Sequence, residues 1–111
     1  MFIQIDSNRF TDHKGDMYDS EWNRLPLKWG IENLPQPLAK PERLEEMFAI
    51  SRKLASRFPF VRVDLYCPGD RIYFGELTFT PGDGEKPVSP AEYNYLLGEV
   101  IDIKHYNDEI V

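Results

Sequence analysis

Four polar residues in the middle of the chain have the side-chain types needed to hold a metal ion or a phosphate. They alternate with apolar residues along two neighbouring segments and are Arg62, Asp64, Glu76 and Thr78. Carboxylate oxygens are the ligands that Mg²⁺ takes from proteins, usually one or two of them beside phosphates and waters. A guanidinium group binds carboxylate or phosphate through two parallel hydrogen bonds. These residue types therefore suggest binding of a divalent cation together with a phosphate group.

A hairpin would bring these four residues onto one face of a sheet. Residues 60–67 and 71–80 have strand-like alternation, and 68–70 form a three-residue loop that contains Gly69. This loop predicts that Arg62 lies opposite Glu76 and that Asp64 lies opposite Phe74. A two-residue loop would mix apolar and polar side chains on each face, which burial opposes. In the predicted register one face is apolar and consists of Val61, Val63, Leu65, Leu77 and Phe79, whereas the four polar residues share the other.

The predicted register makes Asp64 and Glu76 diagonal neighbours, about 7–8 Å apart. Two like charges at that distance repel unless a positive group lies between them. A divalent cation would serve, or Arg62 could neutralise one carboxylate. The alternative is a solvated polar face with an ordinary cross-strand ion pair, and patterning alone favours it. The glycine-containing loop at 81–84, which lets the backbone approach a ligand, favours a binding site.

Two helices are expected around this hairpin. The first spans residues 41–58, with a proline at its first position, acidic residues near its start and Pro59 as its stop signal. The second begins near Ser89, where Pro90 and Glu92 complete a capping box. The apolar stripe of the first helix is a packing face and consists of Leu44, Met47, Phe48, Leu54, Ala55 and Phe58.

The N-terminal part of the chain supplies further strands. Residues 2–6 form a strand with alternating apolar side chains, and residues 17–19 form a weaker second strand. The proline-containing stretch 25–40 is expected to be an ordered connector that Trp22 and Trp29 pin in place. The fold class that follows is α+β, an antiparallel sheet with helices packed on one face.

Composition limits the possible functions. With 111 residues the chain is expected to be a single domain, 1–111. The charge is −6, from 13 basic and 19 acidic residues, which argues against nucleic acid as a partner. No segment has transmembrane length, and the single cysteine, Cys67, cannot form an internal disulfide. We therefore expect a soluble, cytoplasmic protein.

The motif around the four polar residues resembles the distal metal-binding signature of ATP-grasp enzymes. That signature is an Arg-x-Asp strand, a hairpin and Glu-x-Asn leading into Pro-Gly, and here it corresponds to residues 62–64 and 76–82. The longer strings 58–66 and 72–82 are similar to the TupA-like ATP-grasp family, which is linked to teichuronopeptide and other cell-surface polysaccharide biosynthesis. Residues 6–10 and the Tyr18–Asp19 pair look like the middle segment of the same family. The resemblance covers nearly the whole chain.

The resemblance implies a role for each of the four residues. Asp64 and Glu76 would be the metal ligands for magnesium, and Arg62 would be the catalytic contact to the phosphates of ATP. Thr78 stands where most ATP-grasp enzymes have asparagine, and it is kept as a second cofactor-binding residue. The reaction implied is ATP- and Mg-dependent ligation of a carboxylate to an amine, so the partners would be a nucleotide and a carboxylate or amine substrate.

The resemblance concerns only the C-terminal portion of an ATP-grasp enzyme. The lysines that clamp the ATP phosphates lie further upstream in that family, whereas Lys14, Lys28 and Lys40 lie in expected loops without a glycine-rich phosphate cradle. We therefore expect the chain by itself to lack activity. The alternative is a non-catalytic remnant or interaction module, a homo- or hetero-oligomer that pairs through the open sheet edge at residues 2–6.

Overall fold

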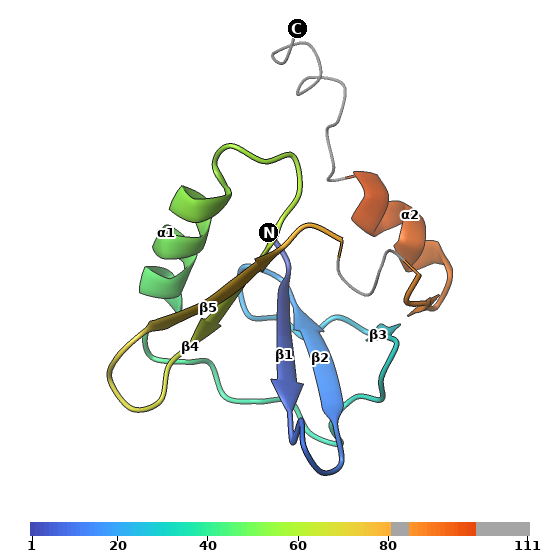
Figure 1. Ribbon diagram of the computed structural model, residues 1–111. Coiled ribbons are helices and arrows are strands. Elements are labelled where there is room, and N and C mark those ends of the chain that lie inside the picture. The colour runs from blue at the N-terminus through green and yellow to red at the C-terminus, as the bar shows by residue number, and fades with distance from the viewer. Residues whose placement is uncertain (81–84, 100–111) are drawn as a thin grey trace, which may run out of the picture. The chain divides into compact units, whose positions relative to one another are not determined.

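The computed structural model describes residues 1–80 and 85–99. The elements within these residues follow the order β1 (Ile3–Ser7), β2 (Lys14–Tyr18), β3 (Lys28–Trp29), α1 (Leu44–Ala55), β4 (Arg62–Tyr66), β5 (Tyr73–Thr78), β6 (Val88–Ser89) and α2 (Glu92–Glu99). The chain divides into two compact units (Figure 1). The first is Met1–Lys40 with Glu85–Gly98, and the described part of the second is residues 41–80 and 99.

The first unit is built on the hairpin of β1 and β2. The strands pair antiparallel from Ile3 opposite Tyr18 to Ser7 opposite Lys14. The turn begins at Asn8, whose φ of 54° is a left-handed conformation that asparagine tolerates better than most residues. Among the described residues β1 pairs only with β2, and Figure 1 shows the two strands side by side.

The core of the first unit lies where three short segments meet. The residues buried together are Met17 of β2, Leu27 just before β3, and Val88 of β6. β6 reaches this place by pairing antiparallel with β3, Val88 opposite Trp29. Partly buried residues surround the cluster, and they are Phe2, Leu25, Trp29, Tyr93 and Leu97. The last two come from α2, so this helix contributes its apolar side to the first unit.

The second unit consists of α1 and the β4–β5 hairpin. Leu44 and Phe48, four residues apart on one side of α1, are its buried residues. α1 packs against β4. The helix begins later than predicted, because the chain first makes a turn in which the Leu44 amide donates to the Pro41 carbonyl at 3.3 Å. It also ends earlier, at Ala55, and the Phe58 amide donates to the Ala55 carbonyl in the turn that follows.

The architecture agrees with the sequence-based expectation in its fold class but not in its sheet. Antiparallel strands and two helices confirm an α+β protein, but the strands of the described residues form three two-stranded sheets rather than one. The predicted capping box is wrong, because Ser89 belongs to β6 and pairs with Lys28 instead of capping α2. The single-domain expectation remains a prediction. Over residues 1–80 and 85–99, neither helix has the length and apolar character to cross a bilayer.

Candidate functional site

The β4–β5 hairpin carries all four polar residues singled out in the sequence, but in a different register from the one predicted. Arg62 lies opposite Thr78 and not opposite Glu76. At the other end Tyr66 lies opposite Tyr73, so the connection spans residues 67–72 and is longer than the three residues expected. The predicted pairing of Asp64 with Phe74 is therefore also wrong, because Phe74 pairs with Leu65.

An irregularity in the ladder explains why the four polar residues nevertheless share one face, as predicted, although Phe74 lies on the other face with Leu65. Val63 pairs with Leu77 and Leu65 pairs with Phe74, so Asp64 alone faces both Gly75 and Glu76. Two residues opposite one is a β-bulge, and a bulge reverses the alternation of the strand that carries it. Glu76 therefore lies on the same side of the hairpin as Asp64, although the strands pair in a different register from the predicted one.

The side chains of these four residues form one connected network. Arg62 donates from Nε to Asp64 Oδ1 at 2.7 Å and from Nη2 to Asp64 Oδ2 at 3.0 Å. The same Nη2 is 3.2 Å from both Glu76 Oε1 and Thr78 Oγ1. Thr78 in turn donates to Glu76 Oε1 at 3.0 Å. Arg62 thus links both carboxylates and the hydroxyl.

The network is accessible from solvent to different degrees. The exposed fraction is 22% for the Asp64 side chain, 33% for Arg62 and 63% for Glu76. One guanidinium facing two carboxylates leaves a formal charge of −1 on the group. The repulsion expected between the carboxylates is thus relieved by Arg62, and a net negative charge remains on an accessible surface.

The donor set of this network fits magnesium. Asp64, Glu76 and Thr78 offer only oxygen atoms, which a hard cation prefers. Over residues 1–80 and 85–99, no three His, Cys, Asp or Glu residues are grouped as metal ligands. Two carboxylates are nevertheless the number that Mg²⁺ commonly takes from a protein when phosphates and waters complete its shell. Pro81 and Gly82, which end the motif, lie outside the described residues.

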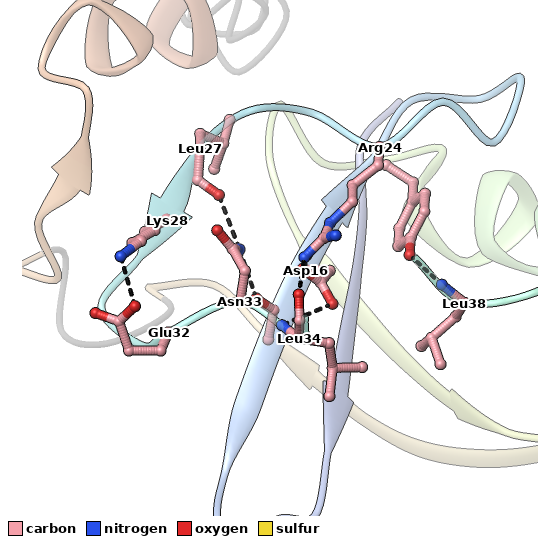
Figure 2. A network of polar contacts seen from close by, with 10 residues as sticks. Asp16, Arg24, Leu27, Lys28, Glu32, Asn33, Leu34 and Leu38 are labelled. Carbon is pink, nitrogen blue, oxygen red and sulfur yellow. Dashed lines mark hydrogen bonds and ion pairs between the residues drawn. The ribbon is translucent and has the colours of Figure 1, made fainter. Parts of the chain in front are cut away.

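A second polar network, which sequence reasoning missed, lies in the first unit. Asp16 of β2 is fully buried, and it accepts hydrogen bonds from Arg24 Nε at 3.0 Å and Nη2 at 2.6 Å. Arg24 also donates to the carbonyl of Leu34, whose amide is 3.4 Å from Asp16 Oδ2. Figure 2 shows Arg24 pointing at Asp16 beside Leu34. The pair therefore ties the connector at residue 34 to β2.

Neighbouring bonds hold the rest of the connector. Asn33 donates to the carbonyls of Gly15 and Leu27 at 2.9 and 3.1 Å. The Leu38 amide donates to the Tyr18 hydroxyl at 2.9 Å. Trp22 stacks on Tyr18 with ring centroids 4.2 Å apart and donates from its indole nitrogen to the Leu38 carbonyl at 3.0 Å. The predicted role of Trp22 in pinning the connector is confirmed.

Two carboxyl groups in the first unit, those of Asp19 and Glu32, have lowered pKa values. The side chain of Asn23, then its amide, then the amide of Glu21 donate to Asp19 and lower the pKa of its carboxyl. A hydrogen bond and the charge of Lys28 lower the pKa of Glu32. Both effects stabilise turns, and neither group belongs to the network around Arg62.

Of three comparisons with known proteins, the comparison with family models gives a match. Residues 1–102 match the family model described as TupA-like ATPgrasp. Comparisons with curated proteins and with solved structures give no match. The matched range includes all the described residues of both units and every residue of the network around Arg62.

Proposed function

The chain belongs to the TupA-like ATP-grasp family, and from this premise we propose that it forms the C-terminal, magnesium- and phosphate-binding part of an ATP-dependent carboxylate–amine ligase. The observation that carries the proposal is the connected network of Arg62, Asp64, Glu76 and Thr78 on the accessible face of β4–β5. In this proposal the second unit corresponds to a piece of the C-terminal lobe of an ATP-grasp domain.

Each residue of the network has a proposed role. Asp64 and Glu76 hold magnesium, which when bound neutralises negative charge on the ATP phosphates. Arg62 contacts the phosphoryl oxygens, a task suited to its planar fork of donors. Thr78 orients a phosphate oxygen or a water molecule through its hydroxyl. The net charge of −1 on the group supports the first role, because a divalent cation complements it.

Arg62 serves this site in two ways. Its fork holds the Asp64 carboxylate in a fixed orientation through two hydrogen bonds of 2.7 and 3.0 Å. Its Nη2 also reaches Glu76 and Thr78. A charged group already oriented by its neighbours loses little freedom when a ligand binds, so the same arrangement favours catalysis by electrostatic stabilisation.

The proposed reaction activates a carboxylate as an acyl phosphate, which an amine then attacks. Positioning and charge stabilisation carry most of such a transfer. The family points to a surface polysaccharide precursor or an amino acid as the substrate. We place the reaction in the cytoplasm, where a nucleotide would be supplied and where a single cysteine such as Cys67 stays reduced.

The first test is calorimetric titration of Mg²⁺–ATP into the chain and into the double variant Asp64→Asn with Glu76→Gln. We expect weak, metal-dependent binding to the unmodified chain and none to the variant, because the variant loses both metal ligands. The matched control is Glu45→Gln with Asp70→Asn, which removes two exposed carboxylates from the second unit outside the network. It should bind like the unmodified chain.

Absence of binding in all three proteins would contradict the proposed role. That result would favour the alternative function, in which the chain is an interaction module that pairs with another chain through β1. A specific observation favours that alternative, since β1 has β2 as its one strand partner among the described residues. Sedimentation over a range of protein concentrations would separate an associating chain from a strict monomer.

A further inference from the structure

We propose that Gly75 is a positioning residue for the network around Arg62, because the bulge at this glycine places Glu76 beside Asp64. The inference rests on the proposed function for the importance of that network. Its geometric part concerns the described residues of β4 and β5 alone.

The bulge determines the side of the hairpin on which Glu76 lies. The pairing of Tyr66 with Tyr73 sets a register that, continued without interruption, would place Val63 opposite Glu76. Glu76 would then point to the side of the hairpin that carries Val63 and Leu65. The extra residue in β5 shifts the ladder, so that Val63 instead pairs with Leu77. Glu76 thereby reaches hydrogen-bonding distance of Arg62, 3.2 Å.

The bulge leaves no space for a side chain at residue 75. A Cβ atom built on Gly75 would lie 2.6 Å from Cε2 of Tyr66 and 3.0 Å from the carbonyl oxygen of Asp64. It would also lie 3.3 Å from the Cβ of Asp64. The tyrosine ring can swing away, but the carbonyl oxygen moves only with the main chain that carries the Asp64 carboxylate.

Position 75 requires a residue without a side chain for a steric reason. Gly30 and Gly69 have positive φ angles, whereas Gly75 does not. The requirement for glycine at 75 is therefore close approach of Tyr66 and Asp64 rather than an unusual backbone conformation. An added methyl group would act directly on Asp64, the residue that Arg62 holds with two hydrogen bonds.

The experiment compares Gly75→Ala with Gly98→Ala, a control in α2 at which an added Cβ meets no atom within 4 Å. The first readout is the NMR resonance of the Arg62 Nε–H group, which reports its bond to Asp64 without any ligand. Asp64→Asn supplies the reference spectrum for the broken pair. We expect the Gly75→Ala resonance to move toward that reference and the Gly98→Ala resonance to stay.

The second readout is the affinity for Mn²⁺–ATP, measured by water-proton relaxation. We expect Gly75→Ala to weaken binding by about ten- to a hundredfold, the usual effect of disturbing residues that orient metal ligands. If the unmodified chain does not bind Mn²⁺–ATP, the proposed function fails, while the Arg62 resonance still decides the positioning role. A Gly75→Ala protein with an unchanged resonance would overturn the inference, even if its melting temperature fell.

A second variant removes the contact with the ring. In Gly75→Ala combined with Tyr66→Ala, the close approach to the Asp64 carbonyl remains, so we expect the resonance to stay displaced. Tyr66→Ala alone should keep the unmodified resonance. Full recovery in the combined variant would show that the ring was the sole obstacle and would overturn positioning through Asp64. Failure of both Gly75 variants to fold would also overturn it, in favour of a purely structural role.

Discussion

Arg62 and Arg24 each donate two hydrogen bonds from two nitrogen atoms to an aspartate, but the two ion pairs differ in their exposure to solvent. The Asp16 side chain has no exposed surface, and its partner Arg24 is 25% exposed. Asp64 is 22% exposed, and Arg62 spreads its donors over a second carboxylate and a hydroxyl. A buried ion pair has a structural role, because neither group can reach a ligand. An ion pair that is partly exposed and carries surplus negative charge can instead exchange one of its partners for a ligand.

The buried pair leads to a prediction about stability. Arg24→Ala would leave the Asp16 carboxylate buried without its charged partner, and we expect it to lower the free energy of unfolding by about 3 kcal/mol. Chemical denaturation monitored by the fluorescence of Trp22 and Trp29, both in the same unit, would measure the change.

The matched control for Arg24 is Lys28→Ala in the same unit. Lys28 forms an ion pair with Glu32 in which both side chains are about half exposed or more, at 48% and 66%. Exposed pairs contribute little, so we expect a loss below about 1 kcal/mol. Equal losses in the two variants would contradict the special role of the buried pair.

Asp19 leads to a prediction about pH. Hydrogen bonds, the largest from the Asn23 side chain, lower the pKa of Asp19 in the folded chain below its unfolded value. The carboxylate therefore contributes stability above the unfolded pKa, and that contribution is lost as the pH falls through the folded pKa. NMR titration of the Asp19 carboxyl carbon should find the lowered pKa, and Asn23→Ala should raise it. An unaltered pKa in that variant would contradict the assignment of the main cause.

At the scale of elements, the β4–β5 hairpin shows what a sequence pattern can and cannot settle. Strict alternation identified Arg62, Asp64, Glu76 and Thr78 as one face, and their hydrogen bonds confirm that they meet. The register was wrong, because counting residues through a hairpin assumes an uninterrupted ladder. The one local signal of interruption was Gly75, a glycine inside a strand, which commonly marks a bulge.

The predictions for other elements were wrong for reasons that lie outside the local sequence. The centre of α1 was predicted from its apolar spacing, but its ends depend on turns at Pro41 and Ala55. Ser89 has the neighbours of a helix cap and instead pairs with Lys28, some 60 residues earlier in the chain. Asp16 offered only an aspartate in a strand of mostly buried residues, and its partner Arg24 lies 8 residues further along the chain.

At the scale of the whole molecule, the division into two units raises the question of whether both units unfold in one cooperative transition. Each unit has its own buried residues, Met17, Tyr18 and Leu27 in the first and Leu44 and Phe48 in the second. Both tryptophans belong to the first unit, whereas α1 belongs to the second. Tryptophan fluorescence therefore reports on the first unit during unfolding, whereas helical circular dichroism reports on both units, because nearly all of α2 belongs to the first unit and α1 belongs to the second.

The expectation of a single domain predicts that a core defect in one unit affects both signals. Phe48→Ala would remove a buried ring from the second unit, and we expect it to cost about 3–5 kcal/mol. If the chain unfolds as one cooperative domain, the fluorescence transition should move together with the circular dichroism transition. The control is Leu54→Ala, also in α1 but 36% exposed, which should shift both signals by a smaller amount. A Phe48→Ala protein whose fluorescence transition stays in place would show that the two units are separate domains, and the metal-binding test could then be made on the second unit alone.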